Sequence, residues 1–176
     1  MNNFQKLKYI EINSENRHCD SHYASVAICI LPTEELVFTK RQDTMPTHKG
    51  QIAFPGGKAQ KEDLDIIDTA VRETSEELLI SKDALFPFGI LTGYDTREFE
   101  YPVFPVICKL DSVDLAIFDT KEVKKILLAP LSYLKDKNNW KFRGYYESDW
   151  IIAIEEEVLW GATAKMTAEL LQLKFD

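Results

Sequence analysis

Three glutamates stand within five residues of one predicted helix, at Glu73, Glu76 and Glu77, directly after Arg72. Residues three and four apart are neighbours on a helix surface, so these carboxylates project from one arc of about 100°. If they converge in a partly enclosed cleft they repel one another by several kcal/mol, and a hard divalent cation with oxygen ligands removes that penalty. The cluster therefore predicts a metal site; the alternative is a solvated acidic helix face, where the repulsion is only a few tenths of a kcal/mol.

Two glycines, Gly56 and Gly57, precede this helix. Glycine permits a sharp backbone turn and leaves the carbonyl of Gly56 bare enough to approach a metal, although a simple turn would use the same residues. Arg72 is predicted to hold a glutamate in one orientation through a bidentate pair, the alternative being an ordinary surface ion pair. Because Mg²⁺ keeps some waters and bridges to substrate phosphates, these parts together predict a site for phosphate chemistry.

The helix that carries the glutamates is predicted over residues 63–79, with Leu64, Ile67, Val71 and Leu78 on one apolar stripe. A second amphipathic helix is predicted over residues 162–174. Strands are predicted at residues 23–31, 36–41, 51–54, 87–92, 103–110, 122–128 and 150–154. Strands interleaved with only two strong helices predict an α/β (α+β) fold with a mixed sheet covered by helices. Residues 1–22 are predicted to form a polar N-terminal arm, and residues 23–176 a single domain.

Composition excludes several classes of protein. The chain has 176 residues and 45% hydrophobic residues, which suits one globular domain. Its net charge of -8 argues against nonspecific binding to nucleic acid or to an anionic membrane. We expect a cytoplasmic protein, because the sequence has neither a signal peptide nor an apolar run of membrane-spanning length. A homodimer is compatible with the sequence.

The cysteines indicate packing rather than chemistry. The chain has three, Cys19, Cys29 and Cys108, and no CxxC pair. An odd number without that spacing predicts neither a disulfide framework nor a zinc site. Cys29 and Cys108 stand in apolar runs and are expected to be buried.

Residues 57–77 resemble the Nudix box, the signature of hydrolases that act on nucleoside diphosphates linked to another group. The general pattern is G-x5-E-x7-R-E-U-x-E-E-x-G-U, where U is a bulky aliphatic residue, and its R-E-x-x-E-E core is complete at residues 72–77. The chain departs from the pattern elsewhere: Asp63 replaces the first glutamate, one extra residue precedes the arginine, Thr74 replaces the first aliphatic residue, and Leu79 replaces the glycine. The resemblance implies a Nudix-like α/β/α sandwich with a mixed sheet between helices.

The departures are similar to those of the coenzyme A pyrophosphatase branch of this family. The run LVFTKRQDTMPTHKGQIAFPGG at residues 36–57 resembles the upstream motif of that branch, L-x-x-T-x-R, a spacer, and G-x-hydrophobic-x-F-P-G-G. Gln42 and Pro46 stand in the spacer where a small residue and a further arginine are often seen. The run LWGATAKM at residues 159–166 resembles the C-terminal W-G-x-T-A segment. The resemblance covers residues 23–171.

The resemblance implies roles for the residues of the box. Glu73 and Glu77 would be metal ligands, and Glu76 either a third ligand or the base that deprotonates water. Gly56 would offer its carbonyl to the metal. Arg72 would orient a glutamate rather than contact substrate. The predicted catalytic set is thus Glu76, Arg72 and Glu77.

Substrate contacts are predicted at the loop before the box. Arg41 and Lys49 are plausible clamps for the phosphates of the nucleotide end, with solvated side chains as the alternative. Gly57 completes the predicted substrate-binding set. A loop after the central strands can bring another acid to the metals in Nudix folds, and Glu98 or Glu100 would be placed to do so.

The activity implied is hydrolysis of a phosphoanhydride assisted by Mg²⁺ or Mn²⁺, which would lower the pKa of a bound water. The substrate would be a small nucleotide, coenzyme A or an acyl derivative, and the products 3′,5′-ADP and 4′-phosphopantetheine. One rival is a Nudix pyrophosphatase for ADP-ribose, NADH or dinucleoside polyphosphates. The other is a non-catalytic ligand-binding module on the same fold.

Overall fold

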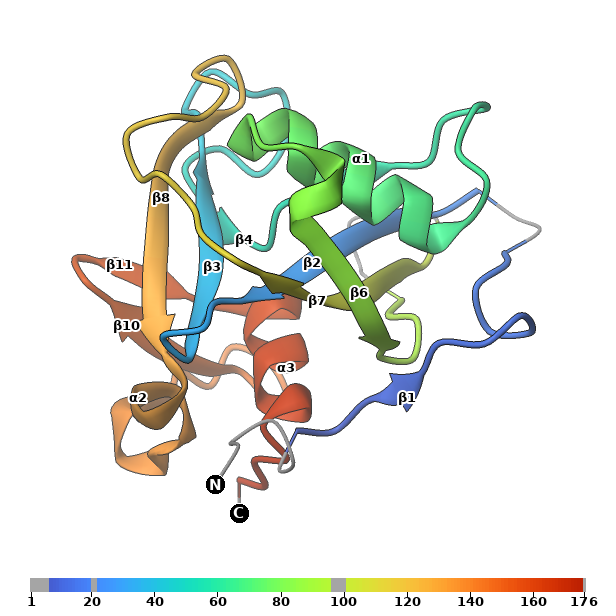
Figure 1. The fold of residues 1–176 in the computed structure, drawn as a ribbon. Coiled ribbons are helices and arrows are strands. Elements are labelled where there is room, and N and C mark those ends of the chain that lie inside the picture. The colour runs from blue at the N-terminus through green and yellow to red at the C-terminus, as the bar shows by residue number, and fades with distance from the viewer. Residues whose placement is uncertain (1–6, 20–21, 96–100, 176) are drawn as a thin grey trace.

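A mixed sheet dominates the structure, a computed structural model that describes residues 7–19, 22–95 and 101–175 (Figure 1). Its path runs β1 (Ile10–Glu11), β6 (Leu85–Ile90), β7 (Val103–Leu110), β2 (Ala24–Ile30), β3 (Glu35–Arg41) and β4 (Ile52–Ala53); β5 (Gly56–Lys58) pairs with β2, and β8 (Val123–Pro130) with β3. β2 and β7 are parallel, and the other named pairs are antiparallel. The mixed sheet is as predicted.

A second, three-stranded sheet lies near the C-terminus. Its order is β11 (Glu157–Leu159), β10 (Trp150–Ile154) and β9 (Trp140–Phe142). The helices are α1 (Ile66–Leu78), α2 (Leu131–Lys135) and α3 (Gly161–Leu170), with short 3₁₀ turns η2 (Lys82–Ala84) and η3 (Lys137–Asn139). The sequence predicted only β10 of this sheet, because strands of three residues are too short to show an alternating pattern. None of the helices in the part of the chain described has the length and apolar character to span a membrane.

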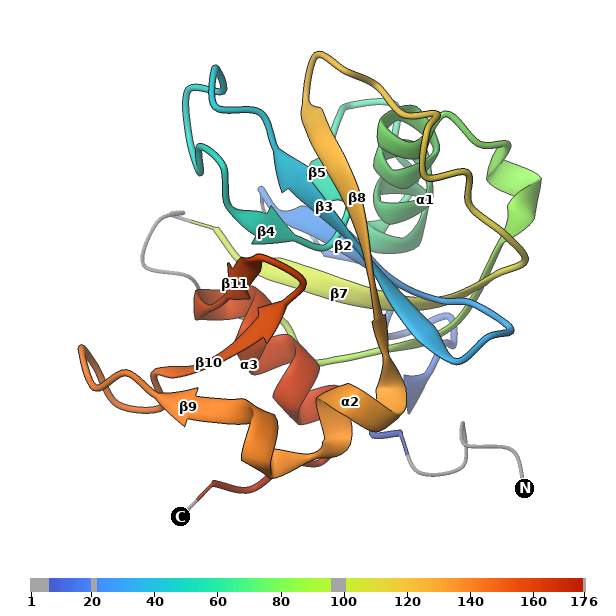
Figure 2. The same ribbon diagram turned by 90° about the vertical axis from the view of Figure 1, so that its left-hand side faces the viewer.

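The main sheet lies between α1 on one face and α3 on the other, as Figures 1 and 2 show from two sides. Successive side chains of a strand point to opposite faces, and β2 divides accordingly. Ala27 and Cys29 pack in the core cluster that includes α1, whereas Ile28 and Ile30 pack in the cluster that includes α3. Burial on both faces explains the continuous apolar run. The sandwich prediction and the burial of Cys29 and Cys108 are confirmed.

The bounds of α1 correct the predicted helix. Asp65 caps the helix, and its Oδ1 accepts hydrogen bonds of 2.9 Å from the backbone N–H groups of Ile67 and Asp68. The helix therefore begins at residue 66 rather than 63. Leu64, predicted in the apolar stripe, precedes the cap and is 80% exposed. At the other end Leu79 adopts a left-handed conformation with φ 51°, at the position where the box pattern has glycine.

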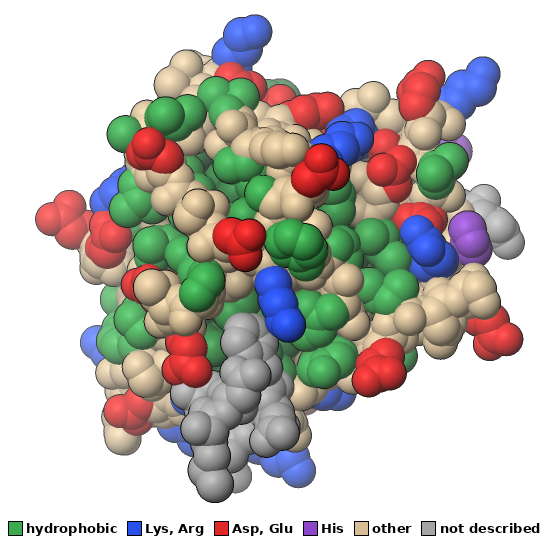
Figure 3. All heavy atoms as spheres, in the orientation of Figure 1, with side chains coloured by type: hydrophobic (Ala, Val, Ile, Leu, Met, Phe, Trp, Pro, Cys, Tyr) green, Lys and Arg blue, Asp and Glu red, His purple; other side chains and the backbone are tan. Residues whose placement is uncertain are grey.

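Part of the predicted N-terminal arm packs against the domain. β1 pairs with β6, and the backbone N–H of Lys8 donates to the Leu170 carbonyl at the end of α3 (2.8 Å). The Arg17 side chain binds the buried Asp65 carboxylate. On the face drawn in Figure 3, acidic, basic and hydrophobic side chains are interspersed. The net negative charge is therefore not concentrated in one acidic patch that would mark a binding site on that face.

Candidate active site

A cavity of about 780 Å³ opens beside the Gly-Gly segment. One part of its wall comes from β2, β4, β5 and α1, and includes Gly56, Gly57 and Glu73. Another part comes from the β9–β10 loop and the start of α3. A cavity of this size accommodates a nucleotide-sized ligand.

Glu77 is the most buried of the three glutamates. It is 4% exposed, and its carboxylate accepts hydrogen bonds from the Thr39 hydroxyl (3.4 Å) and the Gly56 backbone N–H. Burial raises the pKa of Glu77 to about 8, nearby carboxylates add to the rise, and Arg41 opposes it. A buried carboxylate in this setting is costly in its charged form, and a cation beside it offsets the cost.

Both glycines lie in close contact with their surroundings. A Cβ atom on Gly57 would lie 2.5 Å from Oε2 of Glu73. A Cβ on Gly56, whose φ is +152°, would lie 2.3 Å from the Ser25 carbonyl of β2. At Gly56 the contact is with the backbone of β2, so only glycine fits there, whereas a side chain at position 57 would displace the Glu73 carboxylate. Glu73 is itself partly buried, and burial raises its pKa.

Arg72 holds the acidic cluster together. Its Nη1 donates to Glu73 Oε1 at 2.8 Å and to Glu76 Oε2 at 3.3 Å. Its Nε and Nη2 bind the two oxygens of Asp63 at 2.7 and 2.8 Å, and Nη2 also donates to the Lys58 carbonyl. Arg72 therefore contacts two glutamates through one nitrogen, whereas the bidentate pair predicted with a glutamate forms with Asp63 instead. Asp63, which stands where the box pattern has its first glutamate, anchors Arg72, and this contact lowers the pKa of Asp63 to about 2.

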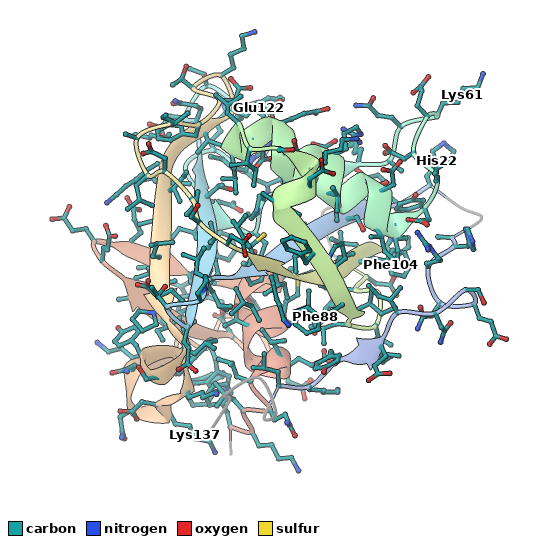
Figure 4. All side chains as sticks on the ribbon, viewed as in Figure 1. His22, Lys61, Phe88, Phe104, Glu122 and Lys137 are labelled. Atoms are coloured by element: carbon teal, nitrogen blue, oxygen red, sulfur yellow. The ribbon has the colours of Figure 1, made fainter. Side chains whose placement is uncertain are left out.

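A fourth carboxylate, Glu122, was not predicted from the sequence. It lines the cavity, and its charge raises the pKa values of both Glu73 and Glu77. Figure 4 shows it beside one end of α1, away from Lys61 at the other. Its segment is tied to that end by the hydrogen bond from the Asp119 N–H to the Glu77 carbonyl (2.9 Å).

Only the tertiary structure brings Glu122 to the box, since 45 residues separate it from Glu77 in the sequence. The available signal is its place immediately before β8, because β8 pairs with β3 and sets Val123 opposite Arg41. The acids that were predicted to approach the site, Glu98 and Glu100, lie outside the described residues.

The predicted cationic residues fall in different places. Arg41 lines the cavity, and its buried Nε has no hydrogen-bond partner in the part of the chain described. Lys49 is exposed and does not line the cavity, because the loop instead turns Thr47 and His48 toward it. Lys58 contributes a second cation to the lining. A phosphate group would therefore meet Arg41 rather than Lys49.

The donor set fits a hard divalent cation. Within the described residues, no three His, Cys, Asp or Glu side chains already surround a common point. The acidic groups that act on the buried Glu77 are nevertheless the carboxylates of Glu73 and Glu122, and hard oxygen donors of this kind suit Mg²⁺ or Mn²⁺ better than softer metals. Mg²⁺ binds through one or two carboxylates and completes its shell with water and substrate phosphates, so a full protein cage is unnecessary.

Comparison with known proteins decides the family. The model of the NUDIX domain matches residues 21–148. The chain belongs to the Nudix family. A protein of Photorhabdus laumondii named "Uncharacterized Nudix hydrolase NudL" is 30% identical over 168 residues, 92% of this chain and 87% of the relative. Its namesake from Yersinia enterocolitica is 29% identical over 160 residues, 87% of this chain and 82% of the relative.

The Nudix fold is also found among solved structures: a NUDIX hydrolase from Nitrosomonas europaea superposes with a TM-score of 0.50 at 15% identity, covering 68% of this chain and 78% of that one. The protein DR0079 of Deinococcus radiodurans superposes with a TM-score of 0.57 at 17% identity, covering 90% of this chain and 87% of that one. The fold prediction is thus confirmed. Family membership gives the activity in outline: a Nudix hydrolase cleaves the pyrophosphate of a nucleoside diphosphate derivative, in general with divalent metal ions.

The raised pKa of Glu77 predicts a pH dependence of stability in the metal-free protein. Between the ordinary glutamate value of 4.5 and about 8, folded Glu77 keeps a proton that the unfolded chain has lost. The contribution of Glu77 to the free energy of unfolding is therefore fully present below pH 4.5 and falls as the pH rises from there to about 8. We expect the melting temperature of wild type, relative to Glu77→Gln, to fall by about 10 °C between pH 5 and pH 8, measured by calorimetry with chelator present. A pH-independent difference would contradict the assigned protonation.

Proposed function

We propose that this Nudix protein hydrolyses coenzyme A or its acyl derivatives to 3′,5′-ADP and 4′-phosphopantetheine. The observation that carries the proposal is the buried Glu77 carboxylate, on which Glu73 and Glu122 act electrostatically. Glu73 and Glu122 line a nucleotide-sized cavity, whereas Glu77 is not among its lining residues. The choice of coenzyme A rests on the motif at residues 36–57, which builds β3, β4 and β5 around this cavity.

The acidic side chains Glu73 and Glu77 would hold Mg²⁺ or Mn²⁺, together with Glu122 and the carbonyl of Gly56, which leaves Glu76 to act as the base. When bound, such ions neutralise charge on the pyrophosphate and lower the pKa of a water molecule, so that hydroxide is available near neutral pH. We add Glu122 to the predicted set because its charge acts on Glu73 and Glu77.

The remaining steps belong to the chain's own residues. Arg41 lines the cavity and binds phosphate oxygens through its guanidinium group. Arg72 keeps Glu73 and Glu76 in place, with Asp63 fixing the guanidinium from its far side. Glu76, whose side chain is 59% exposed, takes up the proton released by the attacking water. Pre-set positions of this kind reduce the reorganisation needed during the reaction.

A side-by-side product analysis tests the substrate. The purified protein is incubated with Mg²⁺ or Mn²⁺ and coenzyme A, acetyl-coenzyme A, ADP-ribose or NADH, and products are separated by chromatography. We expect 3′,5′-ADP and 4′-phosphopantetheine from coenzyme A, with kcat/KM at least about tenfold above that for ADP-ribose and NADH. Rapid turnover of ADP-ribose with coenzyme A left intact would overturn the assignment. If no member of the panel is hydrolysed, the non-catalytic module is favoured.

A further inference from the structure

The β9–β10 loop, residues 143–149, forms a wall of the cavity that the hydrolytic residues leave unexplained. Tyr146, Glu147 and Ser148 line the cavity from this loop. Trp160 and Lys165 line it from the start of α3. The acidic cluster faces the same cavity through Glu73 and Glu122, so one ligand can meet both parts of the wall.

One buried carboxylate holds both arms of this loop. Asp149 is 0% exposed, and its two oxygens accept hydrogen bonds of 3.0 Å from Nε and Nη2 of Arg143. The same carboxylate accepts a 3.0 Å bond from the Tyr145 backbone N–H. The Arg143 N–H in turn donates to the Asp149 carbonyl at 2.9 Å. Because both carboxylate oxygens of Asp149 accept hydrogen bonds from the loop, the bidentate pair fixes the path of the loop.

The guanidinium of Arg143 also joins the loop to α3. Its Cζ lies 4.8 Å from the ring centroid of Tyr145 and 5.1 Å from that of Trp160. On the cavity side, the Lys165 ammonium lies 5.2 Å from the ring of Tyr146. These cation–π contacts place two aromatic rings and one cation together in the cavity wall.

We propose that Arg143 and Asp149 are positioning residues that hold Tyr146 and Trp160 as the binding wall for the phosphorylated adenosine end of the substrate. The inference rests on the proposed function. Aromatic faces suit a stacked purine, and the Lys165 ammonium suits a phosphate on the ribose. The pantetheine chain carries neither a planar ring nor a charge, so it matches this wall poorly.

The proposal predicts a separation of binding from chemistry. The wall would contact a part of the substrate remote from the phosphoanhydride, so its contacts are equally strong in the ground state and in the transition state. Loss of such uniform binding raises KM and leaves kcat unchanged. If the Arg143–Asp149 pair mattered only for folding, its loss would lower the amount of folded protein and would not raise KM at constant kcat.

The test uses Asp149→Asn, which keeps the shape of the side chain but turns one acceptor into a donor facing Arg143. We expect KM for coenzyme A to rise at least about tenfold with kcat within about threefold of wild type. Tyr146→Ala removes the ring and its side-chain hydrogen bond to Asp149 but leaves the Arg143–Asp149 ion pair, and it should give a similar rise in KM. In the double variant KM should rise by less than about twofold beyond its value in either single variant, because the Arg143–Asp149 pair acts through the Tyr146 ring. If Asp149→Asn does not fold, Arg143→Lys takes its place, because lysine keeps the positive charge but cannot form the bidentate pair with Asp149.

Glu155→Gln is the matched control. Glu155 lies in the β10–β11 turn of the same small sheet, pairs with Lys125, and does not line the cavity. The substitution should leave KM unchanged. An unchanged KM in Asp149→Asn, or effects of Asp149→Asn and Tyr146→Ala that multiply, would overturn the proposal.

Binding of 3′,5′-ADP, followed by tryptophan fluorescence without turnover, separates the two proposals. Wild type should bind it at least about tenfold more tightly than Asp149→Asn. If it does so but coenzyme A is not hydrolysed, the proposed function fails and the binding wall stands. If coenzyme A is hydrolysed and both proteins bind 3′,5′-ADP equally, only the wall fails.

Discussion

Glu77→Gln is expected to lower kcat for coenzyme A at least about 100-fold at saturating Mg²⁺, a loss of about 3 kcal/mol of transition-state stabilisation. Gln keeps the size of the side chain and the hydrogen bond from Thr39, but it carries no charge to hold a cation. Because burial already disfavours the charged form of Glu77, the substitution should not lower the melting temperature of the metal-free protein at pH 8. The loss in rate is therefore expected without a loss in stability.

The measurement is steady-state release of 3′,5′-ADP, with Glu62→Gln as the matched control. Glu62 is exposed in the segment between β5 and α1 and makes no described contact with the acidic cluster. The control should retain the wild-type kcat. A Glu77→Gln enzyme with wild-type kcat would remove Glu77 from the reaction, and a large fall in its melting temperature would assign the residue a structural role instead.

Removal of divalent metal is expected to have a still larger effect. With excess EDTA the rate should fall at least about 1,000-fold, because the clustered carboxylates then repel the pyrophosphate instead of binding it through cations. Adding Mg²⁺ or Mn²⁺ in excess of the chelator should restore the rate. The same titration in Glu77→Gln should require more metal for half-maximal activity, since one ligand has lost its charge.

The contrary outcome is simple to recognise. Turnover that persists in EDTA, after the protein has been dialysed and its metal content measured, would leave no role for cations at this cluster. Circular dichroism before and after chelation provides the control, because a loss of fold would also abolish activity. We expect the spectrum to stay unchanged, since two apolar core clusters pack the sheet against its helices.

Elements buried on both faces were predictable from the sequence. β2 and β7 lie in the middle of the sheet, so their residues form continuous apolar runs that indicate strands. The box was predictable for a different reason: the R-E-x-x-E-E core is local, and the contact of Arg72 with Glu73 and Glu76 arises within two turns of one helix. Chemistry confined to one helix leaves its pattern in the sequence.

Contacts between distant segments left no such pattern. Glu122 approaches the box only because β8 pairs with β3, and Asp149 clamps a loop between strands of three and five residues. The sequence also does not distinguish the roles of the two acids near the start of α1. Asp63 and Asp65 look alike in the sequence, yet one anchors Arg72 and the other caps the helix, because the chain turns between them. That turn also leaves Leu64 in solvent.

The most direct test of the central claim is anomalous X-ray scattering from Mn²⁺ in crystals grown with 3′,5′-ADP. The account predicts a manganese peak within metal-ligand distance, about 2.1 Å, of a carboxylate oxygen of Glu77 or Glu73, with Glu122 nearby. Crystals of Glu77→Gln should lose most of that peak. Bound nucleotide with no manganese at these side chains would contradict the account.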